Sequence, residues 1–179
     1  MARIAFVLGQ DFEDSEFRKP YDELRAAGHD IEIVGARAGE VVKGKKGKEE
    51  VAIAAAASER DPSGYDALVI PGGYSPDHLR MDPGVVKFVE GFTRNNKLVA
   101  AVCHGPQLLI EADAVENKTL TSWPSVKKDL LNAGASWVDK EVVIDGNLIT
   151  SRKPDDLPAF ARAINDRLSS RVHATRRAG

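Results

Sequence analysis

The chain alternates short apolar runs with segments in which apolar residues recur at helical spacing. The apolar runs predict strands at 3–9, 30–36, 65–73 and 97–103. Helical spacing predicts helices at 14–29, 82–96, 125–135 and about 155–168, and another that starts at Pro106. Buried strands that alternate with helices favour a parallel sheet covered on both faces. We therefore expect an α/β fold, a flavodoxin-like three-layer α/β/α sandwich with a mostly parallel central sheet.

Two further segments predict antiparallel hairpins. Residues 41–53 contain two short strands around a basic glycine turn, and residues 136–151 form a hairpin that turns at Asp145-Gly146. A solvated tip is the ordinary interpretation of the lysines in the first hairpin, and an anion site is the alternative.

Composition narrows the class of protein. With 179 residues, 42% of them hydrophobic, the chain suits one domain, which we place at residues 1–170, followed by a basic tail at 171–179 that we expect to be disordered. A formal net charge of -2 gives no field that would gather nucleic acid or anionic lipid. No run has the length of a signal peptide core or a membrane span, so we expect a cytoplasmic protein with no nucleic acid or membrane partner.

The single cysteine, Cys103, stands where a predicted strand ends and a helix begins. A nucleophile elbow needs small residues two before and two after the nucleophile, and Ala101 and Gly105 meet that need. Pro106 suits the first position of the following helix. A thiol at that place is favoured as thiolate by the helix dipole. The alternative is that Cys103 is a small buried hydrophobe.

A glycine pair, Gly72 and Gly73, ends another predicted strand. Glycines there let backbone N–H groups approach a substrate, so Gly73 and the N–H of His104 are candidates for an oxyanion hole. An ordinary glycine turn is the alternative. In α/β sheets of this kind, ligands bind beyond the carboxyl ends of the strands, where these residues are expected to meet.

Acidic residues follow the first strand, in "DFEDSE". Asp14 or Ser15 as a cap, with acidic residues in the first turn, accounts for most of them. We expect Glu13 to point at Cys103, where burial and a neighbouring thiolate would favour its protonated form. His104 follows the thiol directly, but the sequence offers no evident group to orient its ring. No metal-ligand spacing occurs, so we expect no metal.

Taken together, several motifs resemble the PfpI family of intracellular cysteine peptidase-like general stress proteins. This family lies within the superfamily that includes DJ-1 and the class I glutamine amidotransferases. The resemblance covers about residues 3–170 and rests on "DFEDSE", "YDALVIPGGYSPDHLR", "AAVCHGPQLLI", "LTSWPSVKKDLLNAGASWVD" and "VVIDGNLITSRKPDDLPAF".

The resemblance implies roles for individual residues. Cys103 matches the elbow nucleophile, His104 the family histidine, Glu13 the carboxyl that hydrogen-bonds the cysteine, and Gly73 the oxyanion-hole glycine. Trp123 falls where the family often has a pocket tyrosine.

The family also implies a homodimer or a larger homo-oligomer with its site near the interface. In its peptidase-like members a carboxylate of a neighbouring subunit completes the catalytic triad. The matching position here is Asp77, which is one methylene shorter than the glutamate of the archaeal peptidase.

The sequence leaves three alternative functions open. The first is a stress-related cysteine-dependent hydrolase without a cofactor, either a peptidase or amidase, or a glyoxalase or deglycase that acts on 2-oxoaldehydes and their adducts. The second is a non-enzymatic redox sensor or stress chaperone that works through oxidation of Cys103. The third is a non-reactive amidotransferase-like binding domain.

Overall fold

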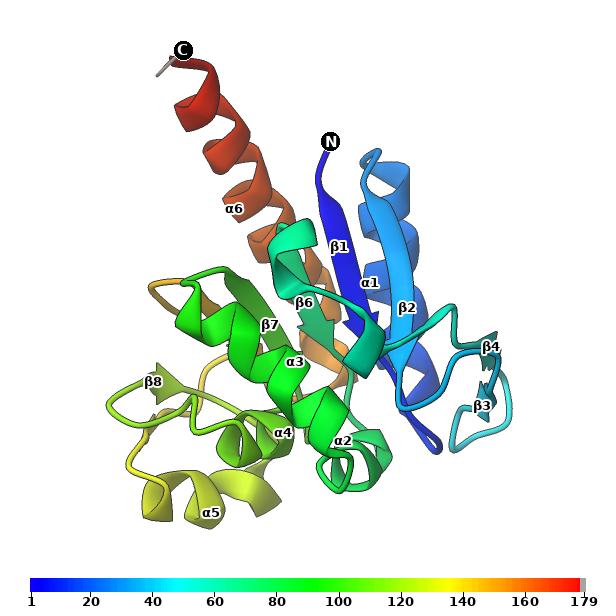
Figure 1. The fold of residues 1–179 in the computed structure, drawn as a ribbon. Helices are drawn as coiled ribbons and strands as arrows, with labels where there is room; N and C mark the ends of the chain where they lie inside the picture. Colours follow the sequence, from blue (N-terminus) through cyan, green and yellow to red (C-terminus); the bar gives the residue numbers. More distant parts are fainter. Residues whose placement is uncertain (178–179) are drawn as a thin grey trace.

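A computed structural model describes residues 1–177 (Figure 1). Its central sheet has seven strands in the order β10-β11-β7-β6-β1-β2-β5. All neighbours are parallel except the pair β10–β11, which confirms the expected α/β class with a mostly parallel sheet. The strands are β1 (Arg3–Val7), β2 (Asp30–Gly35), β5 (Ala55–Ala56), β6 (Ala67–Ile70), β7 (Leu98–Val102), β10 (Val142–Asp145) and β11 (Leu148–Ser151).

The register of the middle strands decides what meets at the sheet's carboxyl edge. Phe6 of β1 lies opposite Val69 of β6, and Ile70 of β6 lies opposite Ala101 of β7. Because β1, β6 and β7 are parallel neighbours, the segments that follow them leave the sheet side by side.

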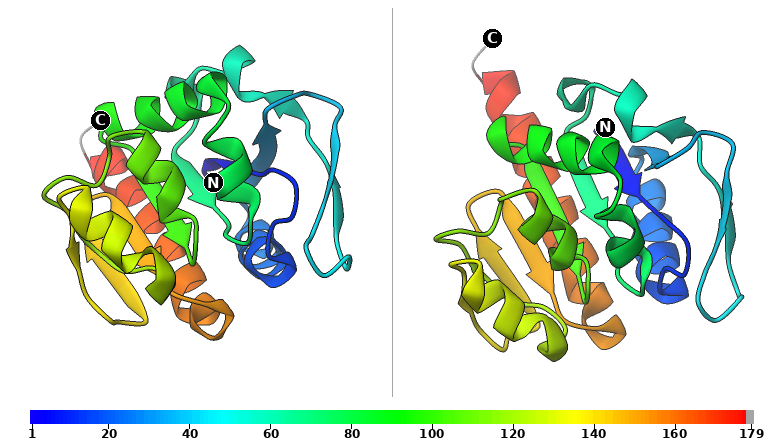
Figure 2. Two further views of the ribbon diagram at one scale, coloured as in Figure 1. Left: turned by 90° about the horizontal axis from the view of Figure 1, so that it is seen from below. Right: turned by 60° about the horizontal axis from the view of Figure 1, so that its bottom comes forward.

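Helices cover both faces of the sheet (Figure 2). On one face α1 (Asp14–Ala26) and α6 (Leu157–Arg177) share an apolar core with the strands. On the other face α3 (Pro83–Arg94) and α4 (Pro106–Glu111) do the same, with α5 (Lys127–Asn132) beside α4. The buried side chains that these helices contribute include Phe17, Leu24, Phe160 and Ile164 on the first face and Val85, Phe88, Leu108 and Leu130 on the second.

The first predicted hairpin is present as a separate two-stranded sheet of β3 (Val41–Lys43) and β4 (Glu50–Ala52). The second was predicted too long. Its turn forms between β10 and β11. The residues expected at its start form β9 (Ser136–Trp137), which pairs in parallel with β8 (Thr119–Leu120) instead. The sequence did not indicate β5, β8 or the short helix α2 (Ser75–Leu79). Short 3-10 turns occur at Ala57–Glu59, Pro62–Gly64, Pro124–Val126 and Pro154–Asp156.

The boundary that we expected at residue 170 falls inside α6, which continues to Arg177. Residues 178 and 179 of the expected tail lie outside the described residues. Within the described part of the chain, we find no helix with both the length and the apolar character of a membrane span.

Candidate active site

The loops that follow β1 and β6 are joined by backbone hydrogen bonds. The N–H of Tyr74 donates to the carbonyl of Asp11 over 2.8 Å, and the N–H of Glu13 donates to the carbonyl of Gly72 over 3.2 Å. These bonds bring the start of α1 against the glycine pair, at the edge of the sheet where β7 also ends.

Cys103 occupies a sharp turn between β7 and α4. Its φ of 62° lies in the left-handed region, which costs a non-glycine residue about 1–2 kcal/mol. A Cβ added to Gly105 would lie 2.6 Å from the carbonyl oxygen of Ile70, so this position has no room for a side chain. The N–H of Cys103 donates to the carbonyl of Ser151 over 3.0 Å. The turn therefore has the crowded geometry of a nucleophile elbow.

The sulfur of Cys103 lies in a polar environment although the residue is only 8% exposed. Burial raises the pKa of the thiol, so the resting sulfur is protonated at neutral pH and the thiolate that we expected from the helix dipole is not its resting form. The backbone N–H groups of His104 and Gly73 donate hydrogen bonds to the sulfur and act in the opposite direction. These two N–H groups are the ones expected to form an oxyanion hole.

The carboxyl beside the thiol belongs to Glu16, whereas we expected Glu13. Glu16 is fully buried beside Cys103 and accepts a hydrogen bond of 2.9 Å from the N–H of Gly72. Burial raises the pKa of Glu16 to about 8, so this carboxyl holds its proton at neutral pH. Its Oε1 atom is buried and has no hydrogen-bond partner.

Glu13 pairs with lysines of the β3–β4 hairpin. Its carboxylate lies 2.9 Å from Nζ of Lys45 and 2.7 Å from Nζ of Lys46. Burial by itself would raise the pKa of Glu13, but the hydrogen bonds and charges of these two lysines outweigh it and lower the pKa. The rotation of the first turn of α1 explains the correction, since Glu13 precedes the helix and Glu16 lies within its first turn.

The His104 ring lies between the thiol and a hydroxyl group. Nδ1 is 3.3 Å from Sγ of Cys103, and Nε2 is 3.3 Å from Oγ of Ser125. Burial, followed by the charge of Lys45, lowers the pKa of His104, so the neutral imidazole predominates at neutral pH. Ser125 is the orienting group that the sequence did not reveal, because only the fold brings it to the ring.

The remaining candidates lie around this centre. Trp123 is 40% exposed, and its backbone N–H donates to the carbonyl of Cys103 over 2.9 Å. Asp77 is exposed on α2, and among the contacts of the described residues none joins it to His104. Among the described residues, no cluster of His, Cys, Asp and Glu is arranged to hold a metal ion.

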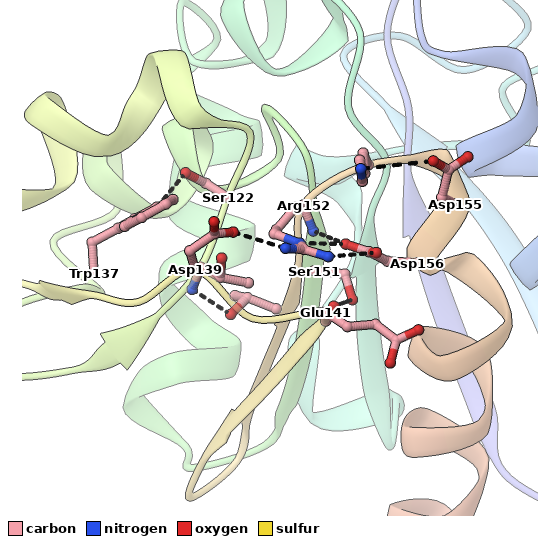
Figure 3. A network of polar contacts seen from close by, with 11 residues as sticks. Ser122, Trp137, Asp139, Glu141, Ser151, Arg152, Asp155 and Asp156 are labelled. Carbon is pink, nitrogen blue, oxygen red and sulfur yellow. Dashed lines mark hydrogen bonds and ion pairs between the residues drawn. The ribbon is translucent and has the colours of Figure 1, made fainter.

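A network of polar contacts supports the segments beside the elbow (Figure 3). Arg152 donates to both oxygens of the buried Asp156 carboxylate, over 2.9 and 3.0 Å, and to Asp139 over 2.8 Å. Ser151, whose carbonyl holds the N–H of Cys103, donates its own hydroxyl to the carbonyl of Glu141 over 2.7 Å. These contacts hold the end of β11 against the turn at Cys103.

A second set of contacts holds the backbone at Trp123. The indole N–H of Trp137 donates to Oγ of Ser122 over 3.0 Å, and this hydroxyl donates to the carbonyl of Trp123 over 2.8 Å. The exposed indole of Trp123 therefore extends from a fixed backbone next to the thiol.

The chain is similar in sequence and in fold to known proteins. Residues 2–167 match the DJ-1/PfpI family. The chain is 49% identical to protein/nucleic acid deglycase 2 of Escherichia coli and 47% identical to general stress protein 18 of Bacillus subtilis, in each case over 89% of this chain and 94% of the relative. A solved structure from Anabaena variabilis, a two-domain protein with DJ-1/ThiJ/PfpI-like and ferritin-like domains, superposes with a TM-score of 0.93 at 44% identity. That match covers 94% of this chain and 48% of the other.

Proposed function

Because this chain belongs to the DJ-1/PfpI family, we propose that it is a stress-related cysteine-dependent hydrolase in which Cys103 is the nucleophile. The observation that carries the proposal is the placement of the Cys103 thiol, on a left-handed turn between the protonated Glu16 carboxyl and two backbone N–H groups. A chain that only binds a ligand has no need of a strained cysteine in such a position.

For a 2-oxoaldehyde, the first step is attack of the Cys103 sulfur on the aldehyde carbon, while the neutral His104 ring, whose Nδ1 lies 3.3 Å from Sγ, takes the thiol proton. A C–S bond forms, and the carbonyl electron pair moves to oxygen, where the N–H groups of Gly73 and His104 stabilise the charge until the His104 ring returns the proton to that oxygen. His104 then takes the proton from the former aldehyde carbon, Glu16 gives its own proton to the neighbouring carbon, and His104 reprotonates Glu16. The first carbon is oxidised, the second is reduced, and water releases the 2-hydroxy acid from the resulting thioester.

Adducts of the same aldehydes, and peptides or other amides, use the same thiol. With an amide, the leaving amine takes a proton and the acyl-enzyme is hydrolysed by water. The E. coli relative named as a deglycase favours adducts as the substrate class, and we give them priority.

The proposal is tested with purified protein on methylglyoxal, on its adducts and on amide substrates. We expect Cys103→Ala to abolish turnover of whichever class the wild type accepts, while circular dichroism shows an intact fold. Full turnover of all three classes by Cys103→Ala would reject the proposal.

A redox sensor or stress chaperone is the second candidate. The free Oε1 of Glu16 and the N–H groups at the sulfur could hold the oxygens of a cysteine sulfinate. Mass spectrometry after mild peroxide distinguishes the two functions. Oxygen uptake that Cys103→Ser abolishes, in a protein without turnover, favours sensing.

The proposal includes a homo-oligomer in which Asp77 of one subunit approaches His104 of another, since Asp77 is exposed on α2. Mixing two inactive variants, Cys103→Ala and Asp77→Ala, then restores part of the turnover in mixed oligomers. A mixture as inactive as its components would exclude a catalytic role for Asp77 across the interface.

We also place the protein in the cytoplasm, where a reducing environment keeps its only cysteine as a free thiol.

A further inference from the structure

The tip of the β3–β4 hairpin, residues 44–49, contains three lysines and is held against the start of α1. We call this segment the basic loop. The buried carboxylate of Asp14 accepts hydrogen bonds from the N–H groups of Lys46, Lys48 and Glu49, over 2.9, 2.8 and 3.0 Å. The loop is thus fixed by its backbone, and its lysine side chains are not needed to attach it.

The basic loop lies close to the candidate oxyanion hole. Phe12 forms bridges with Gly44 on one side and with Gly73 on the other. The N–H of Lys45 donates to the carbonyl of Phe12 over 2.8 Å, which extends this small ladder. The chain at Phe12 therefore lies between the basic loop and Gly73, whose N–H faces the sulfur of Cys103.

Two lysine side chains share one carboxylate in this corner. Glu13, whose side chain is 4% exposed, is paired with both Lys45 and Lys46, and Ser15 also donates to it over 3.2 Å. Glu16 is protonated at neutral pH and adds no negative charge. The carboxylate of Asp14 is held by backbone N–H groups, so Lys45, with a side chain 37% exposed, can meet a solute.

The charge of Lys45 also acts on the groups of the candidate site. It contributes to the lowered pKa of His104, after burial. The pKa of Lys45 itself is raised, first by its hydrogen bond to Glu13 and then by the charge of that carboxylate. The ammonium group is therefore charged and close enough to the site to act on His104.

We propose that Lys45 receives an anionic group, typically a carboxylate, that a substrate carries close to the carbon attacked by Cys103. Glu13 is then a positioning residue that holds the ammonium group at the mouth of the site. This inference rests on the proposed function for the identity of the substrates, but the placement of the charge can be tested without turnover.

A structural ion pair is the simpler explanation of these contacts. It does not account for two lysine side chains on one buried carboxylate, because the neighbouring Asp14 carboxylate is held by backbone N–H groups. Asp14 already secures the loop, so the second ammonium group on Glu13 is not needed to attach it.

The first test compares alkylation of Cys103 by iodoacetate, an anion, and by iodoacetamide, its neutral counterpart, followed by intact mass spectrometry. The ratio of the two rates at one pH cancels differences in thiolate content. We expect Lys45→Met to lower this ratio about fivefold at low salt, as loss of a nearby unit charge implies. Glu13→Gln removes a negative charge, which by itself would raise the ratio, so a lower ratio in this variant would come from loss of the fixed position of the ammonium group.

Lys43→Met is the matched control. Lys43 lies in the same hairpin and pairs with Glu50 over 2.9 Å, with a side chain 58% exposed. Its variant should keep the wild-type ratio. An unchanged ratio in Lys45→Met, or an equal drop in Lys43→Met, would overturn the inference.

The second test measures turnover of the methylglyoxal hemithioacetals of N-acetylcysteine, which carries a carboxylate, and of N-acetylcysteinamide, which does not. We expect Lys45→Met to raise KM for the carboxylate substrate more than KM for the neutral one. If the wild type turns over neither compound but its alkylation ratio depends on Lys45, the deglycase function fails and the anion site stands. If it turns over both and neither measurement depends on Lys45, the anion site alone is rejected.

Discussion

The carboxyl of Glu16 lies buried against the thiol of Cys103, and one of its oxygens accepts the N–H of Gly72. The pair joins the first turn of α1 to the turn after β7, two segments far apart in the chain. Because the carboxyl keeps its proton to about pH 8, it can donate a hydrogen bond to a thiolate and does not compete with it for charge.

Replacing Glu16 should affect catalysis far more than replacing Glu13. Glu16→Gln keeps a hydrogen-bond donor but cannot transfer a proton, and we expect kcat for methylglyoxal to fall about 100-fold or more. Glu13→Gln should reduce it only a few-fold. Steady-state kinetics of the two variants checks this, and equal losses would contradict the assignment of Glu16 as the carboxyl that works on the thiol.

The pH dependence of stability should report the same carboxyl. The pKa of Glu16 is raised in the folded state from an ordinary value of 4.5 to about 8. The folded protein therefore holds this proton where the unfolded chain has lost it, and the stabilisation is fully present below about pH 4.5 and is lost as pH rises through 8.

We expect the free energy of unfolding of Glu16→Gln to fall less steeply between pH 5 and 8 than that of the wild type, by about 1–3 kcal/mol over that range. Urea denaturation at several pH values measures the difference. Parallel curves for the two proteins would show that Glu16 ionises normally in the folded state.

Gly73 and Gly28 offer a matched pair of substitutions. Both have positive φ, 75° and 84°, but a Cβ on Gly73 would lie 2.4 Å from the backbone nitrogen of Glu13, whereas a Cβ on Gly28 meets nothing within 4 Å. Gly28→Ala should cost about 1–2 kcal/mol from backbone strain and preserve activity.

Gly73→Ala should be less stable than Gly28→Ala, and it displaces an N–H group that faces the sulfur. We expect kcat to fall about 100-fold or more, as after loss of an oxyanion-hole donor. Thermal unfolding and turnover measured together check both effects. Wild-type kcat in a folded Gly73→Ala protein would exclude this N–H group from the reaction.

Arg152 should matter for stability. Arg152→Met removes both side-chain donors to Asp156, which is 3% exposed, and leaves that carboxylate without its charged partner. We expect a loss of about 2–3 kcal/mol in the free energy of unfolding.

The control is Arg94→Met, since Arg94 pairs with Glu90 on the surface and its side chain is 74% exposed. That change should cost about 0.5 kcal/mol or less, because solvent screens an exposed pair. Urea denaturation of both variants compares them, and similar losses would show that the contacts of Arg152 add no more than a surface ion pair.

Much of this fold was predictable from local patterns. Uninterrupted apolar runs identified β1, β6 and β7 because a strand buried on both faces needs apolar side chains throughout. The division of the 136–151 segment was not predictable, since pairing of β9 with β8 depends on a partner distant in the chain.

In the candidate site, the sequence by itself determined the position of the nucleophile. A cysteine between Ala101 and Gly105, at the junction of an apolar run and Pro106, has the local requirements of a tight strand-to-helix turn, and these requirements are met by neighbours in the chain.

Only the tertiary structure decided which groups surround the thiol. Glu13 and Glu16 carry the same carboxyl group and stand close together in the sequence. The rotation of α1 against the sheet turns Glu13 toward Lys45 and Glu16 toward Cys103. Ser125 reaches His104 because the fold brings the Pro124–Val126 turn to the imidazole ring. Side-chain direction at a helix start follows from packing against distant segments, which no local pattern records.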